Sequence, residues 1–145
     1  MSSIIIGIDP GTHTGVAIYR DGALFDLLTI EPFQLAETIA DLSPARVVFE
    51  DSRLQSHTWR RGIHNTPAQL KIARDVGQID AWCRLIVATC ERLGIPAHGI
   101  SPKNKGAKLD AEQFKALTGW SGRSNEHTRD AAALAWQFRR VHAGS

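Results

Sequence analysis

Short runs of apolar residues open the chain, and a carboxylate ends the first of them. The β-branched run Ile4–Ile8 has strand length and leads into Asp9. Val16–Tyr19 is a second such run, and Gly11 and Gly15 bracket the turn between the two. We predict a hairpin here. Asp9 needs an explanation, because a carboxylate within an apolar strand is costly to bury unless it is paired or bound to a metal.

The pattern next predicts a third strand, a short helix and a fourth strand. Asp21-Gly22 is a tight turn before the strand Ala23–Ile30, and a helix starts at Pro32 and stops near Ser43. The apolar face of this helix holds Leu35, Ala36, Ile39, Ala40 and Leu42. The strand Arg46–Glu50 follows that crossover helix, so we expect it to pair in parallel. Its last residue lies at a carboxyl strand end, where open α/β sheets bind ligands.

A long helix is predicted from Pro67 to Leu93, after the polar, basic loop Asp51–Asn65. Thr66 and Gln69 form a capping box, and Gly94 ends the helix. Apolar residues recur along it at alternating steps of four and three, as in a straight packing seam: Ile72, Val76, Ile79, Cys83, Ile86, Cys90 and Leu93. The stripe either covers the sheet or contributes to a homodimer interface, and both interpretations stay open.

The remaining elements complete a single α/β domain over residues 1–145. Ile95–Ser101 is predicted as a fifth strand, a small helix runs from Asp110 to Thr118, and the last helix runs from Glu126 to about Val141. The buried face of the last helix is expected to hold Ala131, Leu134, Ala135 and Phe138. The expected sheet is therefore five-stranded and mixed, with three antiparallel strands, two parallel strands and helices on both faces.

Composition is that of an ordinary globular protein, with 43% hydrophobic and 22% charged residues. No apolar run approaches the ~20 residues that a membrane span requires, and the start of the chain lacks a signal-peptide pattern. Cys83 and Cys90 lie seven residues apart on one predicted helix, so we expect buried thiols and a cytoplasmic location.

The formal net charge of +2 is unevenly distributed. Five acids and no basic residue occur from Asp21 to Asp41, whereas Arg53 to Arg74 contains five basic residues and no acid. A further basic group comprises Lys103, Lys105 and Lys108. This asymmetry favours a polyanion partner, although a solvated basic loop would have the same composition.

Carboxylates and an imidazole stand next to apolar structure in three places. They are Asp9, Glu50, and the pair His127 and Asp130, whose i, i+3 spacing puts both on one face of the last helix. If the first and fourth strands are neighbours, all four side chains converge. Three acids so close together repel one another, and a divalent cation removes that cost. Oxygen ligands favour Mg²⁺, and the histidine shifts the balance slightly towards Mn²⁺.

Each of these residues also has a purely structural interpretation. Asp9 precedes Pro-Gly and can cap a turn, Glu50 can simply end a strand, and Asp130 can pair with Arg123 or Arg129. His127 lies in the first turn of a helix, where histidine is more often structural. The combination, in this order and on these elements, is more specific than any single residue.

With these motifs the chain resembles the RuvC-type Holliday junction resolvases of the RNase H-like superfamily. In its length it resembles the compact phage-encoded members of that family. The resemblance covers most of the chain and is carried by IIGIDPGTHTGVA, VVFED, VGQID and HTRDAAALA. It implies that Asp9, Glu50, His127 and Asp130 bind two Mg²⁺ ions and cut branched DNA, leaving 5′-phosphate and 3′-hydroxyl ends. It also implies a homodimer with the long helix in its interface.

The resemblance implies a DNA-binding surface as well, with two departures. Arg53 stands where the family often has a wedge phenylalanine, and Trp59 is a substitute that can stack on unpaired bases. The loop after Glu50 is longer than in typical bacterial members, which puts strict four-way-junction selectivity in question. The expected DNA-binding residues are Arg53, Trp59, Arg60, Arg61, Lys71, Arg74, Lys103, Lys105 and Lys108.

Two other functions remain open on sequence alone. The first hairpin is similar to the first phosphate loop of ATPases of the actin and sugar-kinase type, which need a second such lobe. A non-catalytic module that binds branched nucleic acid by charge is the other alternative, and the complete acidic set argues against it.

Overall fold

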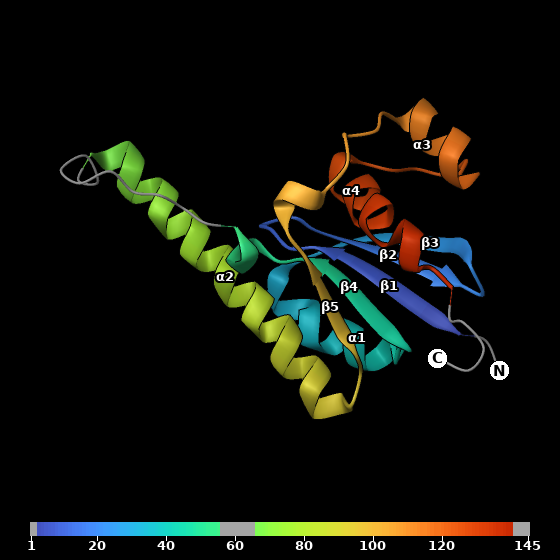
Figure 1. The fold of residues 1–145 in the computed structure, drawn as a ribbon, viewed down its shortest axis with the longest axis horizontal. Coiled ribbons are helices and arrows are strands. Elements are labelled where there is room, and N and C mark those ends of the chain that lie inside the picture. Colours follow the sequence, from blue (N-terminus) through green and yellow to red (C-terminus); the bar gives the residue numbers. More distant parts are fainter. Residues whose placement is uncertain (1–2, 56–65, 141–145) are drawn as a thin grey trace.

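Five strands form one mixed sheet in the computed structural model, which describes residues 3–55 and 66–140. The strand order is β3-β2-β1-β4-β5 (Figure 1). The strands are β1 Ile4–Asp9, β2 Thr14–Arg20, β3 Ala23–Ile30, β4 Arg46–Glu50 and β5 Ala97–Ile100. The first three are antiparallel, β4 runs parallel to β1, and β5 runs parallel to β4. The predicted mixed α/β sheet is therefore confirmed.

Helices cover both faces of this sheet (Figure 1). The helices are α1 Leu35–Leu42, α2 Pro67–Leu93, α3 Ala111–Thr118 and α4 Glu126–Ala135. Short 3₁₀ turns are η1 Pro32–Gln34, η2 Ser52–Leu54, η3 Pro102–Asn104 and η4 Trp136–Phe138. Helices α1 and α2 pack on one face, and α4 packs on the other together with Phe114 of α3.

Alternation along the strands divides the core into two layers. In β1, Ile6 and Ile8 face α1 and α2, whereas Ile5 faces α4; in β4, Phe49 faces α2 and Val48 faces α4. All five side chains are at most 1% exposed. Successive side chains of a strand point to opposite faces, so the residue two positions beyond Val48 also lies on the α4 side.

Helix α2 is supported by the sheet along only part of its length. It has 27 residues, which at ~1.5 Å per residue makes it about 40 Å long. Its buried residues, Cys83, Ile86, Thr89 and Cys90, all lie in the C-terminal half. Leu70 and Ile72, near the other end, are 48% and 52% exposed. Figure 1 shows this N-terminal half extending beyond the sheet. The sheet-covering interpretation of the apolar stripe therefore holds for its C-terminal part.

The bounds of three elements differ from the prediction. The first helix begins as the 3₁₀ turn η1, and Ala40 is exposed. Strand β5 is shorter than Ile95–Ser101, because Pro96 has no N–H to donate and the Ser101 hydroxyl accepts from the N–H of Lys103 to cap η3. Helix α4 ends at Ala135 and continues as a 3₁₀ turn, and Val141 lies outside the described residues.

Candidate active site

Strand alternation brings Asp9 and Glu50 to the same face of the sheet. Asp9 follows Ile5 and Gly7 on the α4 side of β1, and Glu50 follows Val48 on the α4 side of β4. The two strands are parallel neighbours, with Ile8 opposite Phe49 in the register. Both carboxylates consequently stand at adjacent carboxyl strand ends, beneath helix α4.

Glycines in β1 and β2 let α4 approach the sheet closely. A Cβ added at Gly7 would meet the backbone of Ala131, and one added at Gly15 would meet the carbonyl of His127. The Tyr19 hydroxyl also donates to the Ala132 carbonyl oxygen at 2.6 Å. This tight packing holds the first turns of α4 over the strand ends.

The N-terminus of α4 is fixed by its own capping residues. The Asn125 side chain accepts from the N–H of Thr128 and donates to the Thr29 hydroxyl of β3, with both distances 2.9 Å. His127 and Asp130 lie on the first and second turns of this anchored helix. As a result, the i, i+3 pair faces the carboxylates of the sheet.

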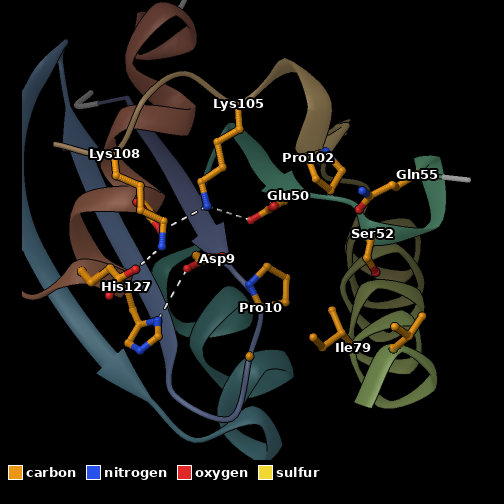
Figure 2. Close-up of a pocket in the computed structure, with 14 residues that line it drawn as sticks. Asp9, Pro10, Glu50, Ser52, Gln55, Ile79, Pro102, Lys105, Lys108 and His127 are labelled. Atoms are coloured by element: carbon orange, nitrogen blue, oxygen red, sulfur yellow. Dashed lines mark hydrogen bonds and ion pairs between the residues drawn. The ribbon is translucent and has the colours of Figure 1, made fainter. Parts of the chain in front are cut away.

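A cavity of about 420 Å³ collects all four predicted site residues, Asp9, Glu50, His127 and Asp130. The Nδ1 atom of His127 lies 3.7 Å from Asp9 Oδ2. Val76 and Ile79 of α2 line the cavity opposite α4, so the cavity spans the carboxyl ends of β1 and β4 (Figure 2). The geometry therefore brings together in one place the four residues named from the sequence.

A lysine lies at the centre of this cluster. Lys105 Nζ is 3.3 Å from Glu50 Oε2 and 3.1 Å from Asp130 Oδ2 (Figure 2). The sequence predicts DNA binding for Lys103, Lys105 and Lys108 alike and does not distinguish among them. Lys103 is exposed, while Lys108 pairs with Glu126 at the rim. Lys105 alone of the three contacts the predicted site carboxylates in the described structure.

The electrostatics show that negative charge exceeds positive charge in the cluster. Burial, the hydrogen bond with Glu50 and the neighbouring carboxylates together raise the pKa of Asp9 to about 8, although Lys105 opposes them. Burial disfavours the charged ammonium of Lys105, but Glu50 and Asp130 more than offset this, so the lysine pKa is raised. The ammonium is therefore charged near neutral pH, yet it does not fully compensate the carboxylates around it.

One charged residue that lines the cavity was not singled out from the sequence. Glu126 lines the cavity beside His127, and Lys108 lowers the pKa of its carboxyl group. The sequence signal that could have identified Glu126 is its position as the first residue of a helix capped by Asn125. Beside the cavity, the His13 ring lies 5.9 Å from the His127 ring.

The backbone that carries Glu50 is held by a polar network. Arg53 directs its guanidinium at Asp51, with Nε 2.9 Å from Oδ1 and Nη2 2.8 Å from Oδ2. The Ser52 hydroxyl donates to Asp80 of α2 at 2.6 Å, and the Cys83 thiol donates to the Glu50 carbonyl at 3.5 Å. These contacts fix the 3₁₀ turn η2 against α2.

The predicted DNA-binding residues are distributed around the cavity and along α2. Lys71 and Arg74 are exposed on the extended half of α2, where Lys71 pairs with Asp75 at 3.7 Å. Lys103 and Lys108 are exposed on the segment between β5 and α3, whereas Lys105 is partly buried. Arg53 is paired with Asp51 as described. Trp59, Arg60 and Arg61 lie outside the described residues.

The donor set suits a hard divalent cation. Three carboxylates supply oxygen atoms, the ligands that hard divalent cations prefer, and Lys105 is the ammonium beside them. Within residues 3–55 and 66–140, however, no three acidic, histidine or cysteine side chains lie close enough together to bind one metal ion. Lys105 instead lies between two of the carboxylates.

Comparisons with known proteins identify the fold of this chain. No family model and no curated protein sequence matches the chain. Among solved structures, RuvC from T. thermophilus in complex with a Holliday junction substrate aligns with a TM-score of 0.62 and 18% identity, over 92% of this chain and 90% of that chain. A Thermus thermophilus RuvC structure aligns with a TM-score of 0.57 and 17% identity, over 92% and 91%.

The chain has a RuvC-type fold. The predicted RNase H-like architecture is thereby confirmed, and the resemblance to compact phage-encoded members stays a prediction. The RuvC-type fold also accounts for the position of the cavity, at the carboxyl ends of the two central parallel strands. Among the described residues, every helix is too short or too polar to cross a lipid bilayer.

Proposed function

We propose that this protein is a metal-dependent, structure-specific endodeoxyribonuclease that hydrolyses phosphodiester bonds in Holliday junctions or other branched DNA. The products would carry 5′-phosphate and 3′-hydroxyl ends. The observation that carries the proposal is the convergence of Asp9, Glu50, His127 and Asp130 in one cavity of a RuvC-type fold. One of the similar solved structures is T. thermophilus RuvC in complex with a Holliday junction substrate.

Asp9, Glu50, His127 and Asp130 would hold two Mg²⁺ ions, or Mn²⁺. When bound, such ions activate water and stabilise the leaving oxygen of a phosphodiester. Asp9 and Asp130 offer carboxylate oxygens from the sheet and from α4, and Glu50 offers a third from the neighbouring strand. His127 is 44% exposed at its side chain and faces Asp9, so it acts as a ligand or as a base that accepts a proton.

Basic residues around the cavity would hold the DNA backbone. Lys103 and Lys108 beside the site, and Lys71 and Arg74 on α2, offer exposed cationic groups for phosphates. Arg53, Trp59, Arg60, Arg61 and Lys105 complete the proposed DNA-binding set. Arg53 is included because its side chain is 33% exposed, although its guanidinium also pairs with Asp51.

A homodimer would pair two such sites for the two strands of a junction. The exposed Leu70 and Ile72 on the unsupported half of α2 favour this helix as the interface. Leu70 also lines a surface depression with Pro67, Ala73 and Arg74. We further propose a reducing cytoplasm as the compartment, since Cys83 and Cys90 are both free and buried.

The alternative functions receive no specific support. An ATPase of the actin and sugar-kinase type needs two lobes, whereas the strands of residues 3–55 and 66–140 form one sheet. A non-catalytic binding module would not require buried carboxylates to converge at adjacent strand ends.

The test is cleavage of end-labelled four-way, three-way, flap and linear DNA in Mg²⁺ and in Mn²⁺. We expect cleavage of branched substrates only, loss of cleavage in EDTA, and loss of cleavage with retained binding for Asp9→Asn. Full activity of Asp9→Asn, or cleavage that persists in EDTA, would refute the assignment. Binding with no cleavage in either metal would favour the binding module.

A further inference from the structure

Lys105 bridges two acidic residues from different parts of the fold. Glu50 ends β4 and Asp130 lies in α4, and the ammonium is within 3.3 Å of one oxygen of each. The side chains of Lys105, Glu50 and Asp130 are 21%, 19% and 10% exposed. The pairs are thus largely shielded from water, where Coulomb attraction is stronger than at a surface.

The position of this ammonium conflicts with direct cation binding by the same carboxylates. Mg²⁺ needs oxygen ligands at about 2.0–2.1 Å, and a divalent ion there would repel a lysine that touches the same oxygens. In the parts of the chain that the structure describes, no three histidine, cysteine, aspartate or glutamate side chains are close enough together to hold one metal ion. Glu50 and Asp130 instead share the ammonium.

The segment that carries Lys105 spans the cavity from β5 to α3 (Figure 2). It is also joined to α4 by Lys108, which pairs with Glu126, and by the Leu109 carbonyl, which accepts from Arg129 Nε at 3.0 Å. These two contacts lie outside the acidic cluster, so they can persist when Lys105 leaves it. The lysine side chain can therefore move without detachment of the whole segment.

We propose that Lys105 is a tethered counter-ion that a divalent cation must displace from Glu50 and Asp130. In the metal-free protein it offsets part of the repulsion among the carboxylates. On cation binding its ammonium leaves the cluster. The inference rests on the proposed function in one respect, because it takes the acidic cluster as the cation site.

Cation affinity without DNA tests this directly. Free Mn²⁺ is measured by electron paramagnetic resonance during titration of the wild type, Lys105→Met, Lys105→Arg and Lys115→Met. Lys115 is an exposed lysine of α3, away from the cavity, and controls for loss of one positive charge. We expect Lys105→Met to bind Mn²⁺ at least about tenfold more tightly, since the competing charge is gone. Lys105→Arg and Lys115→Met should stay near the wild-type value.

A second measurement uses the wild type alone and does not depend on a variant that folds. Acetic anhydride modifies exposed lysine amines, and mass spectrometry reports the rate at each site. Lys105 should react slowly in EDTA and several-fold faster in saturating Mn²⁺. Lys115 should react at the same rate in both.

The outcomes separate this inference from the proposed function. Mn²⁺ binding by the wild type that is unchanged or weaker in Lys105→Met would overturn the counter-ion role and leave the cation site standing. Equal modification of Lys105 with and without Mn²⁺ would overturn it in the same way. Absence of any Mn²⁺ binding by the wild type would overturn the inference and the proposed metal site together.

Discussion

The backbone of Gly15 in β2 lies directly against the carbonyl of His127 in α4. A Cβ at position 15 would also lie 2.9 Å from the Thr128 nitrogen, so the helix would have to shift. The same helix carries Asp130, and its opening turn sets the distance between His127 and Asp9. A residue without a side chain thus sets the geometry of the proposed site.

Replacement of Gly15 by alanine should therefore damage both stability and activity. We expect the free energy of unfolding to fall by about 2 kcal/mol, because overpacking against backbone cannot be relieved by a rotamer change. Cleavage of a four-way junction should fall as well. Urea denaturation and the cleavage assay measure the two effects.

Gly77→Ala is the matched control for this change. Gly77 lies within α2, and an added Cβ would meet nothing within 4 Å. This variant should be up to ~1 kcal/mol more stable than the wild type, through helix propensity. A Gly15→Ala protein as stable and active as Gly77→Ala would contradict the packing argument.

Asp9 should make the metal-free protein less stable as the pH rises. Its pKa of about 8 in the folded chain lies above the ordinary value of 3.8, so the folded state binds the proton more strongly than the unfolded state. Stability then falls from about pH 4 to about pH 8 and levels off above that. Asp9→Asn should remove this contribution and be at least about 1 kcal/mol more stable at pH 9.

Urea denaturation in EDTA at pH 5, 7 and 9 compares the two proteins. Added Mg²⁺ should stabilise the wild type more than Asp9→Asn, since the cation offsets the same charge. A variant less stable than the wild type at pH 9 in EDTA would show that Asp9 is satisfied without a cation.

Arg53 should contribute to stability through Asp51. The Asp51 side chain is 5% exposed, and hydrogen bonds from Arg53 hold its pKa below the ordinary value. Arg53→Ala leaves that carboxylate without its partner, at an expected cost of about 1 to 3 kcal/mol at pH 7. Because the pKa of Asp51 is lowered in the folded state, this stabilisation is present above about pH 4 and lost as the pH falls further.

Arg84→Ala, at an exposed position of α2, is the control and should change stability little. Thermal or urea unfolding at pH 7 and pH 3 measures both variants. A loss for Arg53→Ala that is as large at pH 3 as at pH 7 would exclude the ion pair as its source.

Leu70→Asp should weaken the proposed dimer. A carboxylate on the exposed, unsupported half of α2 would have to be buried between two copies of the helix. Sedimentation equilibrium should show a dimer for the wild type and a dissociation constant raised by tenfold or more, about 1.4 kcal/mol, for the variant. Leu117→Asp on α3, where leucine is 41% exposed, should sediment like the wild type. Identical association of all three proteins would remove Leu70 from the interface.

Much of the fold was predictable because local signals agree with the tertiary structure. Val48 and Glu50 alternate with Val47 and Phe49, and that two-residue period already places Glu50 on one face. The capping boxes at Thr66 and Asn125 mark the starts of α2 and α4. Where a boundary depended on a competing local bond, as at Ser101, the pattern alone missed it.

The candidate site was predictable as a set of acids and less so in its charge balance. Asp9, Glu50, His127 and Asp130 lie on regular elements, so their directions follow from period and order. Lys105 lies in an irregular segment, and its contact with Glu50 spans 55 positions in the chain. No local pattern distinguishes it from its neighbouring lysines. The roles of all these residues stay predictions until they are tested.

Half of α2 has no sheet beneath it, and this has a mechanical consequence. The helix is buried against the rest of the fold between Cys83 and Cys90, whereas its first residue, Pro67, lies far from that buried part. A small tilt of the buried part displaces the free N-terminal end of the helix further than it displaces the buried part itself. Any molecule bound at the free end would therefore be repositioned relative to the candidate cavity by very slight repacking around Cys83 and Cys90.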